Sequence, residues 1–222
     1  PALYKKVPYK LSDLAPVSQV AKSADLLMVP RSSGVTTLQQ FVDKAKAAPG
    51  TLNFGSYGNA TSSHMNGERF KQKAGIFALH IPYRGAGPAL NDTVAGQVPI
   101  IFDNLPSALP FIKENRLVPI VVAAPQRVAA LPNVPTFKEV GLEPVNRMAY
   151  YGILGPKNLP KEVVDKINGG VKKALEDAAV RKRIEDTGSI IVANTPEQFA
   201  QQIKDELAVY KQVVAKQKLK LE

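Results

Sequence analysis

Three short segments rich in glycine and polar side chains carry the residues best suited to chemistry. They are Gly55-Ser56-Tyr57-Gly58-Asn59-Ala60-Thr61-Ser62-Ser63, Tyr83-Arg84-Gly85-Ala86-Gly87 and Phe102-Asp103-Asn104. Backbone N–H groups at a helix start, together with hydroxyl and amide donors, bind anions without a cationic side chain. Glycines let such N–H groups approach a ligand closely. The three segments therefore predict an anion-binding site.

The first segment also has a purely structural interpretation. Gly55 and Gly58 could serve only a tight turn, and Thr61 or Ser62 could be no more than an N-cap.

A structural role without ligand binding is also an alternative for single residues of the other two segments and for the two histidines. Arg84 could pair with a carboxylate at the surface, and Asp103 could cap the helix that follows it. His64 and His80 are expected to be packed side chains rather than catalytic ones. Binding is favoured because three such segments occur together.

Common catalytic motifs do not fit. Gly55-Ser56-Tyr57-Gly58 lacks the order of the hydrolase nucleophile elbow, and no histidine follows late in the chain. The segment also lacks the Gly-Lys-Ser/Thr ending of a nucleotide phosphate loop. With no cysteine and two histidines, the sequence offers no thiol nucleophile, disulfide or zinc site. We expect a binding module without cofactor or metal, and a catalytic α/β protein acting on a small acid remains the weaker alternative.

Alternating strands and helices are predicted to position the three segments. Apolar runs predict strands over 25–29, 51–54, 77–83, 98–102 and 118–123, and helical periodicity predicts helices over 37–48, 62–73, 88–95 and 107–114. This alternation is typical of an α/β domain with a parallel sheet. In such a sheet the three segments would lie at the carboxyl ends of their strands, on the edge where open α/β sheets bind ligands.

The C-terminal part of the chain has a different pattern. It contains strand runs over 148–154 and 189–192 and two long helices, one from Pro160 and one with Thr195 as N-cap. Their apolar stripes are Val164, Ile167, Val171, Leu175 and Ala178 in the first helix, and Phe199, Ile203, Leu207, Tyr210 and Val214 in the second. Both stripes need a sheet to cover, so we expect that strands of this part are absent.

Composition excludes several classes of protein. The 222 residues, 45% of them apolar, suffice for one large domain or two small ones. No run approaches 18 apolar residues, which argues against a membrane-spanning helix. The net charge of +10 is spread along the chain, without a basic run or interleaved aromatics, so nucleic-acid binding is not expected. A diffuse positive field can attract small anions.

At these residues the sequence resembles the periplasmic solute-binding proteins of tripartite tricarboxylate transporters, the Bug family. The matching stretches are 53–64, 81–90 and 102–108, with weaker matches at 4–17 and 127–136. The resemblance implies an α/β, periplasmic-binding-protein-like (type II) Venus-flytrap of two lobes joined by two crossing strands. Such a protein captures a small carboxylate, which is an amino acid, a monocarboxylate or a dicarboxylate, for membrane transporter subunits. A ligand-sensing subunit of a signalling system is the alternative.

On this resemblance residues 27–145 form one complete lobe, and residues 1–26 and 146–222 belong to the other. The chain starts at Pro1 without an initiator methionine or an apolar signal region. Family members carry a signal peptide and further strands before the residues that match Pro1. We therefore expect the other lobe to be incomplete and the chain to be prone to self-association through exposed sheet edges.

The resemblance also implies roles for single residues. The ligand carboxylate would be bound by Ser56, Tyr57, Asn59, Thr61, Ser62 and Ser63, and the opposite wall would be formed by Gly85, Ala86 and Gly87. Asp103 would face the distal end of the ligand. A charged carboxylate there disfavours a second anionic group and favours an ammonium, a hydroxyl or a ring nitrogen. An amino acid or a monocarboxylate is thus expected over a tricarboxylate.

Overall fold

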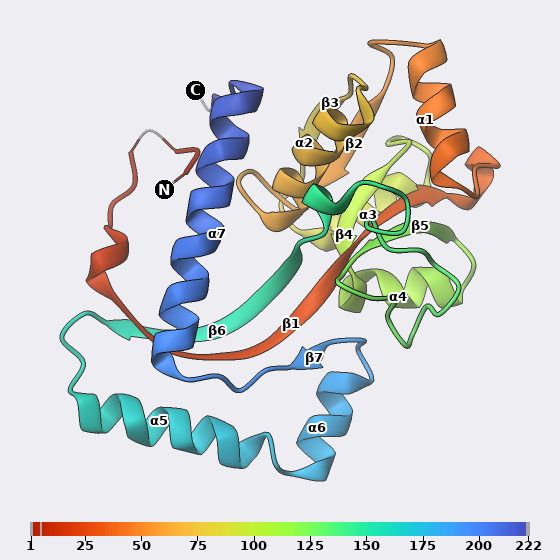
Figure 1. Ribbon diagram of the computed structural model, residues 1–222. Coiled ribbons are helices and arrows are strands. Elements are labelled where there is room, and N and C mark those ends of the chain that lie inside the picture. Colours follow the sequence, from red (N-terminus) through yellow and green to blue (C-terminus); the bar gives the residue numbers. More distant parts are fainter. Residues whose placement is uncertain (1, 5, 221–222) are drawn as a thin grey trace. The chain divides into compact units, whose positions relative to one another are not determined.

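Two compact units make up the computed structural model, which describes residues 2–4 and 6–220. Unit 2 is the continuous segment Ser23–Ala149, and unit 1 combines Pro1–Lys22 with Tyr150–Glu222. The lobes expected from the resemblance, 27–145 and 1–26 with 146–222, remain a prediction. Strand β1 (Leu14–Pro30) is a single strand of 17 residues that contributes to both units (Figure 1).

The sheet of unit 2 has the strand order β3-β2-β4-β1-β5. Its other strands are β2 (Asn53–Ser56), β3 (Leu79–Pro82), β4 (Ile101–Asn104) and β5 (Leu117–Ala123). β2 pairs with β3 and β4 in parallel, whereas β1 runs antiparallel to β4 and β5. The prediction of an all-parallel sheet was therefore wrong for β1. The run 25–29 is not the first strand of a βαβ series but the end of a strand that begins in unit 1.

Helices α1 (Leu38–Ala47), α2 (Ser62–Ala74), α3 (Ala86–Val94) and α4 (Leu105–Lys113) cover this sheet. Their bounds agree with the predicted ones to within a few residues. α1 starts with the predicted capping box, in which Thr37 accepts from Gln40 N and the Gln40 side chain accepts from Thr37 N. Short 3₁₀ turns occur at Leu11–Asp13, Arg31–Ser33 and Glu143–Val145.

Two hydrophobic clusters fill the two faces of the sheet because side chains alternate along β1. Leu27 and Val29 belong to the cluster that also contains Phe41 of α1 and Phe70 of α2. The other cluster contains Leu26 and Met28 of β1, Leu90 of α3 and Leu105 of α4. Unit 2 therefore has three layers, a central sheet with helices and a hydrophobic cluster on each face.

Unit 1 contains β6 (Met148–Pro156), which starts at the end of unit 2, together with α5 (Lys161–Ala174), α6 (Ala178–Glu185), β7 (Ile190–Ile191) and α7 (Pro196–Gln217). β6 and β7 both pair with β1. The prediction that one helix runs from Pro160 to Ala178 is wrong at its C-terminal end, because α5 ends at Ala174. Asp177 breaks it by capping α6, where its Oδ1 accepts from Ala179 N and Val180 N at 2.9 and 3.0 Å. Ala178, expected on the buried stripe, is consequently exposed.

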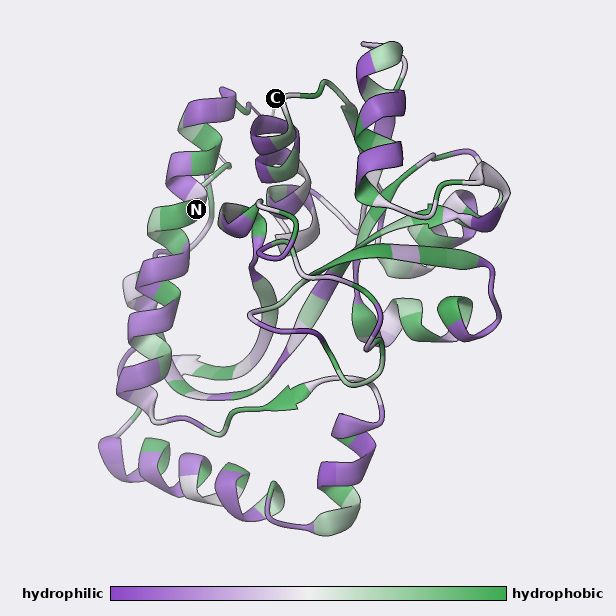
Figure 2. Cartoon of the chain, turned by 45° about the vertical axis from the view of Figure 1, so that its right-hand side comes forward, coloured by the Kyte–Doolittle hydropathy of each residue, from purple (hydrophilic) through white to green (hydrophobic). Residues whose placement is uncertain are grey.

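Large apolar side chains remain exposed in unit 1. Tyr151, Leu154, Ile167 and Ile190 each have 36–44% of their surface accessible. Of the ten stripe residues predicted in this part of the chain, only Leu175 and Phe199 are fully buried. Purple and green residues alternate along α5 and α7 in Figure 2, so these helices are amphipathic. Most of the predicted apolar stripes are therefore only partly covered by the described residues.

No helix in the described part of the chain combines the length and apolar character needed to cross a bilayer.

Candidate ligand-binding site

The three polar segments meet at one edge of the unit 2 sheet. β2, β3 and β4 are parallel and end at Ser56, Pro82 and Asn104, after which α2, α3 and α4 begin. Asp25 of β1 is paired in register with Asn104, so it lies at the same edge. Three helix N-termini and one further strand therefore lie at this edge.

Hydroxyl groups of the first segment are used mainly to hold its own shape. Thr61 is the N-cap of α2, accepting from His64 N at 3.3 Å and donating to Gly58 O at 2.7 Å. Ser63 Oγ donates to Phe102 O of β4, and Ser56 Oγ is fully buried against Gly58 and His80. These three predicted ligand contacts are thus already engaged within the protein.

Asn59 is the predicted residue whose donor is still available. It lies half-buried in the same segment, and its side chain makes no hydrogen bond to the described residues. Ser62 and Tyr57 are also half-buried, with Ser62 Oγ 2.5 Å from Tyr57 OH. Asn59 and the first turn of α2 are therefore the donors that an anion can reach at this edge.

The second segment offers backbone groups rather than side chains. Gly85 is the N-cap of α3 at φ +110, a left-handed conformation that favours glycine, and no side chain of the described residues caps this helix. A Cβ atom at Gly85 or Gly87 would meet no atom within 4 Å. Gly85 is the N-cap of α3, and Ala86 and Gly87 are its first two helical residues, so the N–H groups of this turn have no carbonyl partner within the helix. Arg84 is exposed, as the structural interpretation expected.

The third segment places a buried acid at the edge. Asp103 Oδ1 accepts from Asn104 N at 2.7 Å and from Asn104 Nδ2 at 3.1 Å. Asp103 Oδ2 is buried and has no partner among the described residues. Asn104, and not Asp103, caps α4, because its Oδ1 accepts from Ser107 N. Burial raises the pKa of Asp103 to about 8, and the nearby charge of Asp25 adds to the rise.

Asp25 is the functional candidate that the sequence reasoning missed. It is fully buried and accepts hydrogen bonds from Asn66 Nδ2 at 2.8 Å and Tyr57 OH at 3.5 Å. Burial raises its pKa to about 7, and hydrogen bonds from Ser62, Asn66 and Tyr57 oppose the rise. The one signal for Asp25 in the sequence is its place directly before the apolar run Leu-Leu-Met-Val. That position predicts the start of a strand and not a site residue.

Raised pKa values change the electrostatics of this edge. With pKa values of about 7 and about 8, Asp25 and Asp103 carry a large share of their protons at neutral pH. Burial also raises the pKa of Tyr57, so its hydroxyl stays protonated. The edge therefore bears less negative charge than two fully ionised carboxylates would give it.

The two histidines lie beneath the first segment as a stacked pair. Their ring centroids are 3.7 Å apart and the rings are inclined by 10°. Burial lowers the pKa of His64 to about 3 and that of His80 to about 4, so both are neutral. The described residues contain no group of three His, Cys, Asp or Glu side chains able to hold a metal ion.

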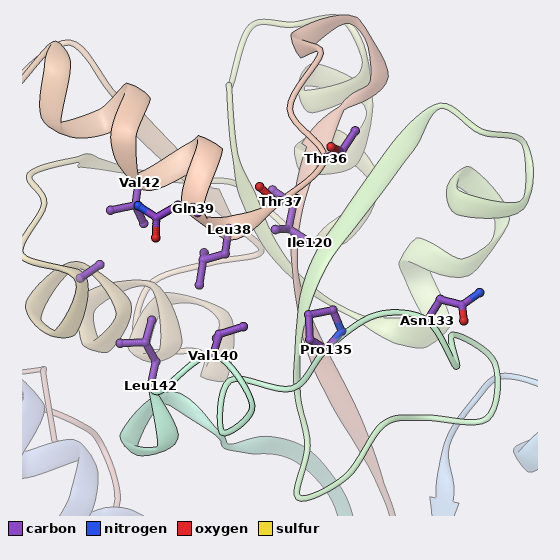
Figure 3. A pocket seen from close by; sticks show the side chains of 11 residues that line it. Thr36, Thr37, Leu38, Gln39, Val42, Ile120, Asn133, Pro135, Val140 and Leu142 are labelled. Carbon is purple, nitrogen blue, oxygen red and sulfur yellow. The ribbon is translucent and has the colours of Figure 1, made fainter.

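A separate pocket of about 610 Å³ lies elsewhere in unit 2, between the start of α1, β5 and the segment 133–142. Figure 3 shows Leu38 and Val42 on one side of it and Val140 and Leu142 on the other. None of the predicted site residues lines this apolar pocket.

Comparison with known proteins decides the family. The model of the tripartite tricarboxylate transporter family receptor, TctC, matches residues 1–219. The chain belongs to this receptor family. Protein BugT of Bordetella pertussis is 28% identical over 99% of the chain and 68% of its own length, which confirms the resemblance to the Bug family.

Solved structures agree with the assignment to the TctC family. One described as a periplasmic transporter is 38% identical, with a TM-score of 0.92 over 98% of this chain and 73% of that chain. MatC from Rhodopseudomonas palustris with bound malate is 28% identical, with a TM-score of 0.88 over 96% and 74% of the two chains. The α/β periplasmic-binding-protein fold predicted from the sequence is therefore confirmed.

This TctC-family chain spans only part of the length of several curated relatives. It spans 63–68% of the length of the curated relatives that it matches nearly from end to end.

Proposed function

We propose that this chain belongs to a periplasmic receptor that captures a small carboxylate and presents it to membrane transporter subunits. The observation that carries the proposal is the convergence of three helix N-termini on one sheet edge, beside two buried acids whose pKa values burial raises to about 7 and about 8. Helix N-termini attract anions. A family of transporter receptors supplies the biological context.

Each predicted site residue takes a role according to what its atoms already bind. Asn59 and the first-turn N–H groups of α2 contact one end of the ligand, and the N–H groups of Gly85, Ala86 and Gly87 contact it from the second segment. Ser56, Thr61 and Ser63 shape the first segment, since their hydroxyls have partners in the protein. Tyr57 and Ser62 join the first segment to Asp25.

Asp103 sets the class of ligand. Its unpartnered Oδ2 faces no described protein donor or acceptor, so a ligand group supplies the missing partner. When protonated, Asp103 donates to a carboxylate or hydroxyl oxygen and does not repel a second acidic group. Dicarboxylates therefore belong to the ligand class beside amino acids and monocarboxylates, and malate bound to MatC supports including them.

A thermal-shift screen tests the proposed function. The full-length gene product without its signal peptide is heated with mono-, di- and tricarboxylates and amino acids, and calorimetry measures Kd for every compound that raises Tm. Ligands that bind only the folded state raise Tm with concentration. We expect the rise to be confined to small carboxylates. A screen in which none of them shifts Tm overturns the proposal.

The partner is tested separately by crosslinking the loaded receptor in membranes of its own host. Recovery of transporter subunits is the expected outcome, and recovery of a signalling protein in their place overturns the transport assignment.

A further inference from the structure

The first polar segment turns into α2 through an unusual backbone conformation. Ala60 has φ +61, which lies in the left-handed region that residues with a Cβ rarely adopt. Its N–H group donates to Nδ1 of His64 at 3.1 Å, four residues along the chain. His64 is therefore the side chain that holds Ala60 in this conformation.

The hydrogen bond from Ala60 determines the protonation of His64. A ring nitrogen that accepts a hydrogen bond carries no proton, so His64 is neutral with its proton on Nε2. Nε2 lies 3.9 Å from Oε1 of Glu68. Protonating Nδ1 would set an N–H group of the ring against the N–H group of Ala60 and break the contact.

His80 supports the other end of the same turn. Its Nε2 lies 2.6 Å from Ser56 Oγ, which also accepts from Gly58 N and donates to Gly58 O, both at 3.2 Å. All three contacts are made at once when His80 carries its proton on Nε2. The His80 ring stacks on His64 and packs 4.9 Å from the ring of Phe54.

Burial is the main reason that both rings stay neutral. Glu68 and Lys71 of α2 face it, and Lys71 Nζ lies 2.8 Å from Glu68 Oε1. Burial and the positive charge of Lys71 hold both histidine pKa values far below neutrality. The hydrogen bonds to Ala60 and Ser56 thus persist across the neutral pH range.

We propose that His64 and His80 are positioning residues of the anion-binding turn, with the neutral His64 ring fixing Ala60 and its stacked partner fixing Ser56. Asn59 lies between these two anchored residues, and α2 starts directly after them. The pair therefore sets where the Asn59 side chain and the first-turn N–H groups stand. This inference rests on the proposed function for its effect on ligand affinity.

Three substitutions of His64 test the contact. Asn places its Oδ1 near the position of Nδ1, whereas Gln places its oxygen one bond further out and Leu offers no acceptor. All three lose the ring stack, so the comparison isolates the position of the acceptor. We expect His64→Leu and His64→Gln to weaken carboxylate binding by about 10-fold or more, and His64→Asn to remain within about 3-fold of wild type. Equal loss in all three overturns the positioning role.

A readout that needs no ligand keeps the two proposals distinguishable. In the ¹⁵N spectrum of the wild-type protein, His64 Nδ1 should show the shift of an unprotonated ring nitrogen, and the Ala60 amide should exchange slowly. Exchange at Ala60 should accelerate by about 10-fold or more in His64→Gln and stay slow in His64→Asn. A protonated Nδ1, or unchanged exchange in His64→Gln, overturns the inference even if carboxylates bind. The expected signature without any carboxylate binding overturns the proposed function alone.

Discussion

Asn66 Nδ2 donates a hydrogen bond to Asp25 Oδ2 at 2.8 Å, and the same nitrogen donates to Arg147 O at 3.1 Å. Asp25 lies two residues after unit 2 begins, and Arg147 lies two residues before it ends. Asn66 of α2 therefore ties the helix whose N-terminus forms the anion site to both segments through which the chain enters and leaves this unit.

Substituting Asn66→Ala should cost stability and ligand affinity together. The change leaves a buried carboxylate oxygen and a carbonyl without their donor, which costs about 1–3 kcal/mol. Urea denaturation measures the first effect and calorimetry the second.

Asn168→Ala is the matched control for this substitution. Asn168 is a buried asparagine of unit 1 whose Nδ2 donates to Val17 O and Asn194 O, both at 2.9 Å. It should lose similar stability and keep the ligand affinity of the folded protein. Equal affinity loss in both variants would show that Asn66 acts only through general stability.

The Asn59→Ala substitution should weaken ligand binding by about 1–3 kcal/mol while leaving the free energy of unfolding nearly unchanged, because its side chain donates to no described residue. Calorimetry with the best ligand of the screen gives the number. Asn133→Ala, which alters the rim of the 610 Å³ pocket, serves as control and should bind normally. The reverse pattern would move the ligand site to that pocket.

Stability should fall as pH rises through the range where Asp103 keeps a proton that the unfolded chain has lost. Burial raises its pKa from 3.8 to about 8, so the folded state binds more protons between about pH 4 and pH 8. Asp103→Asn removes the share of this dependence that Asp103 contributes, worth about 2–5 kcal/mol over the window, and leaves the share of Asp25, whose pKa burial raises to about 7. Urea denaturation at pH 5 and pH 8 measures it.

Asp43→Asn, an exposed position of α1, controls for the loss of one acidic group and should keep the wild-type pH dependence. If the Asp103→Asn variant kept the full wild-type pH dependence as well, and not only the share that Asp25 contributes, Asp103 would not be protonated in the folded state.

Gly67→Ala should destabilise the protein by about 1–3 kcal/mol through overpacking. A Cβ atom at Gly67 would lie 2.2 Å from Cε2 of Phe54, whose ring packs on His80 beneath the anion-binding turn. Gly169→Ala in α5 meets no atom within 4 Å and should instead stabilise by up to about 1 kcal/mol. Thermal and urea denaturation of the two variants should therefore shift in opposite directions.

Much of unit 2 could be predicted from the sequence because its signals are local. The capping box at Thr37, the N-cap at Thr61 and the apolar runs fix where helices and strands begin and end. The convergence of the three polar segments followed from the rule that parallel strands share an edge. No local signal in the sequence gives the direction of β1. Its antiparallel orientation is defined only by its pairing with β4 and β5.

Contacts between distant residues account for what could not be predicted. Asp25 and Asn66 are 41 positions apart, and neither forms a motif that specifies the other. Ser56 and His80 meet because β2 and β3 are neighbours in register. Whether a polar side chain is free to bind a ligand depends on such neighbours. The sequence alone therefore did not show that the Ser56 hydroxyl has partners in the protein whereas the Asn59 amide has none among the described residues.

The divided sequence of unit 1 affects how the receptor is made. Ala21 and Lys22 pair with Ile191 and Ile190. These pairs cannot form until β7 has been synthesised, about 170 residues after the first half of β1. Unit 2 is continuous and can fold while the rest of the chain is still being synthesised. Pairings between residues so far apart in sequence form slowly. The first half of β1 thus gains its pairing with β6 and β7 only after the whole of unit 2 has been synthesised.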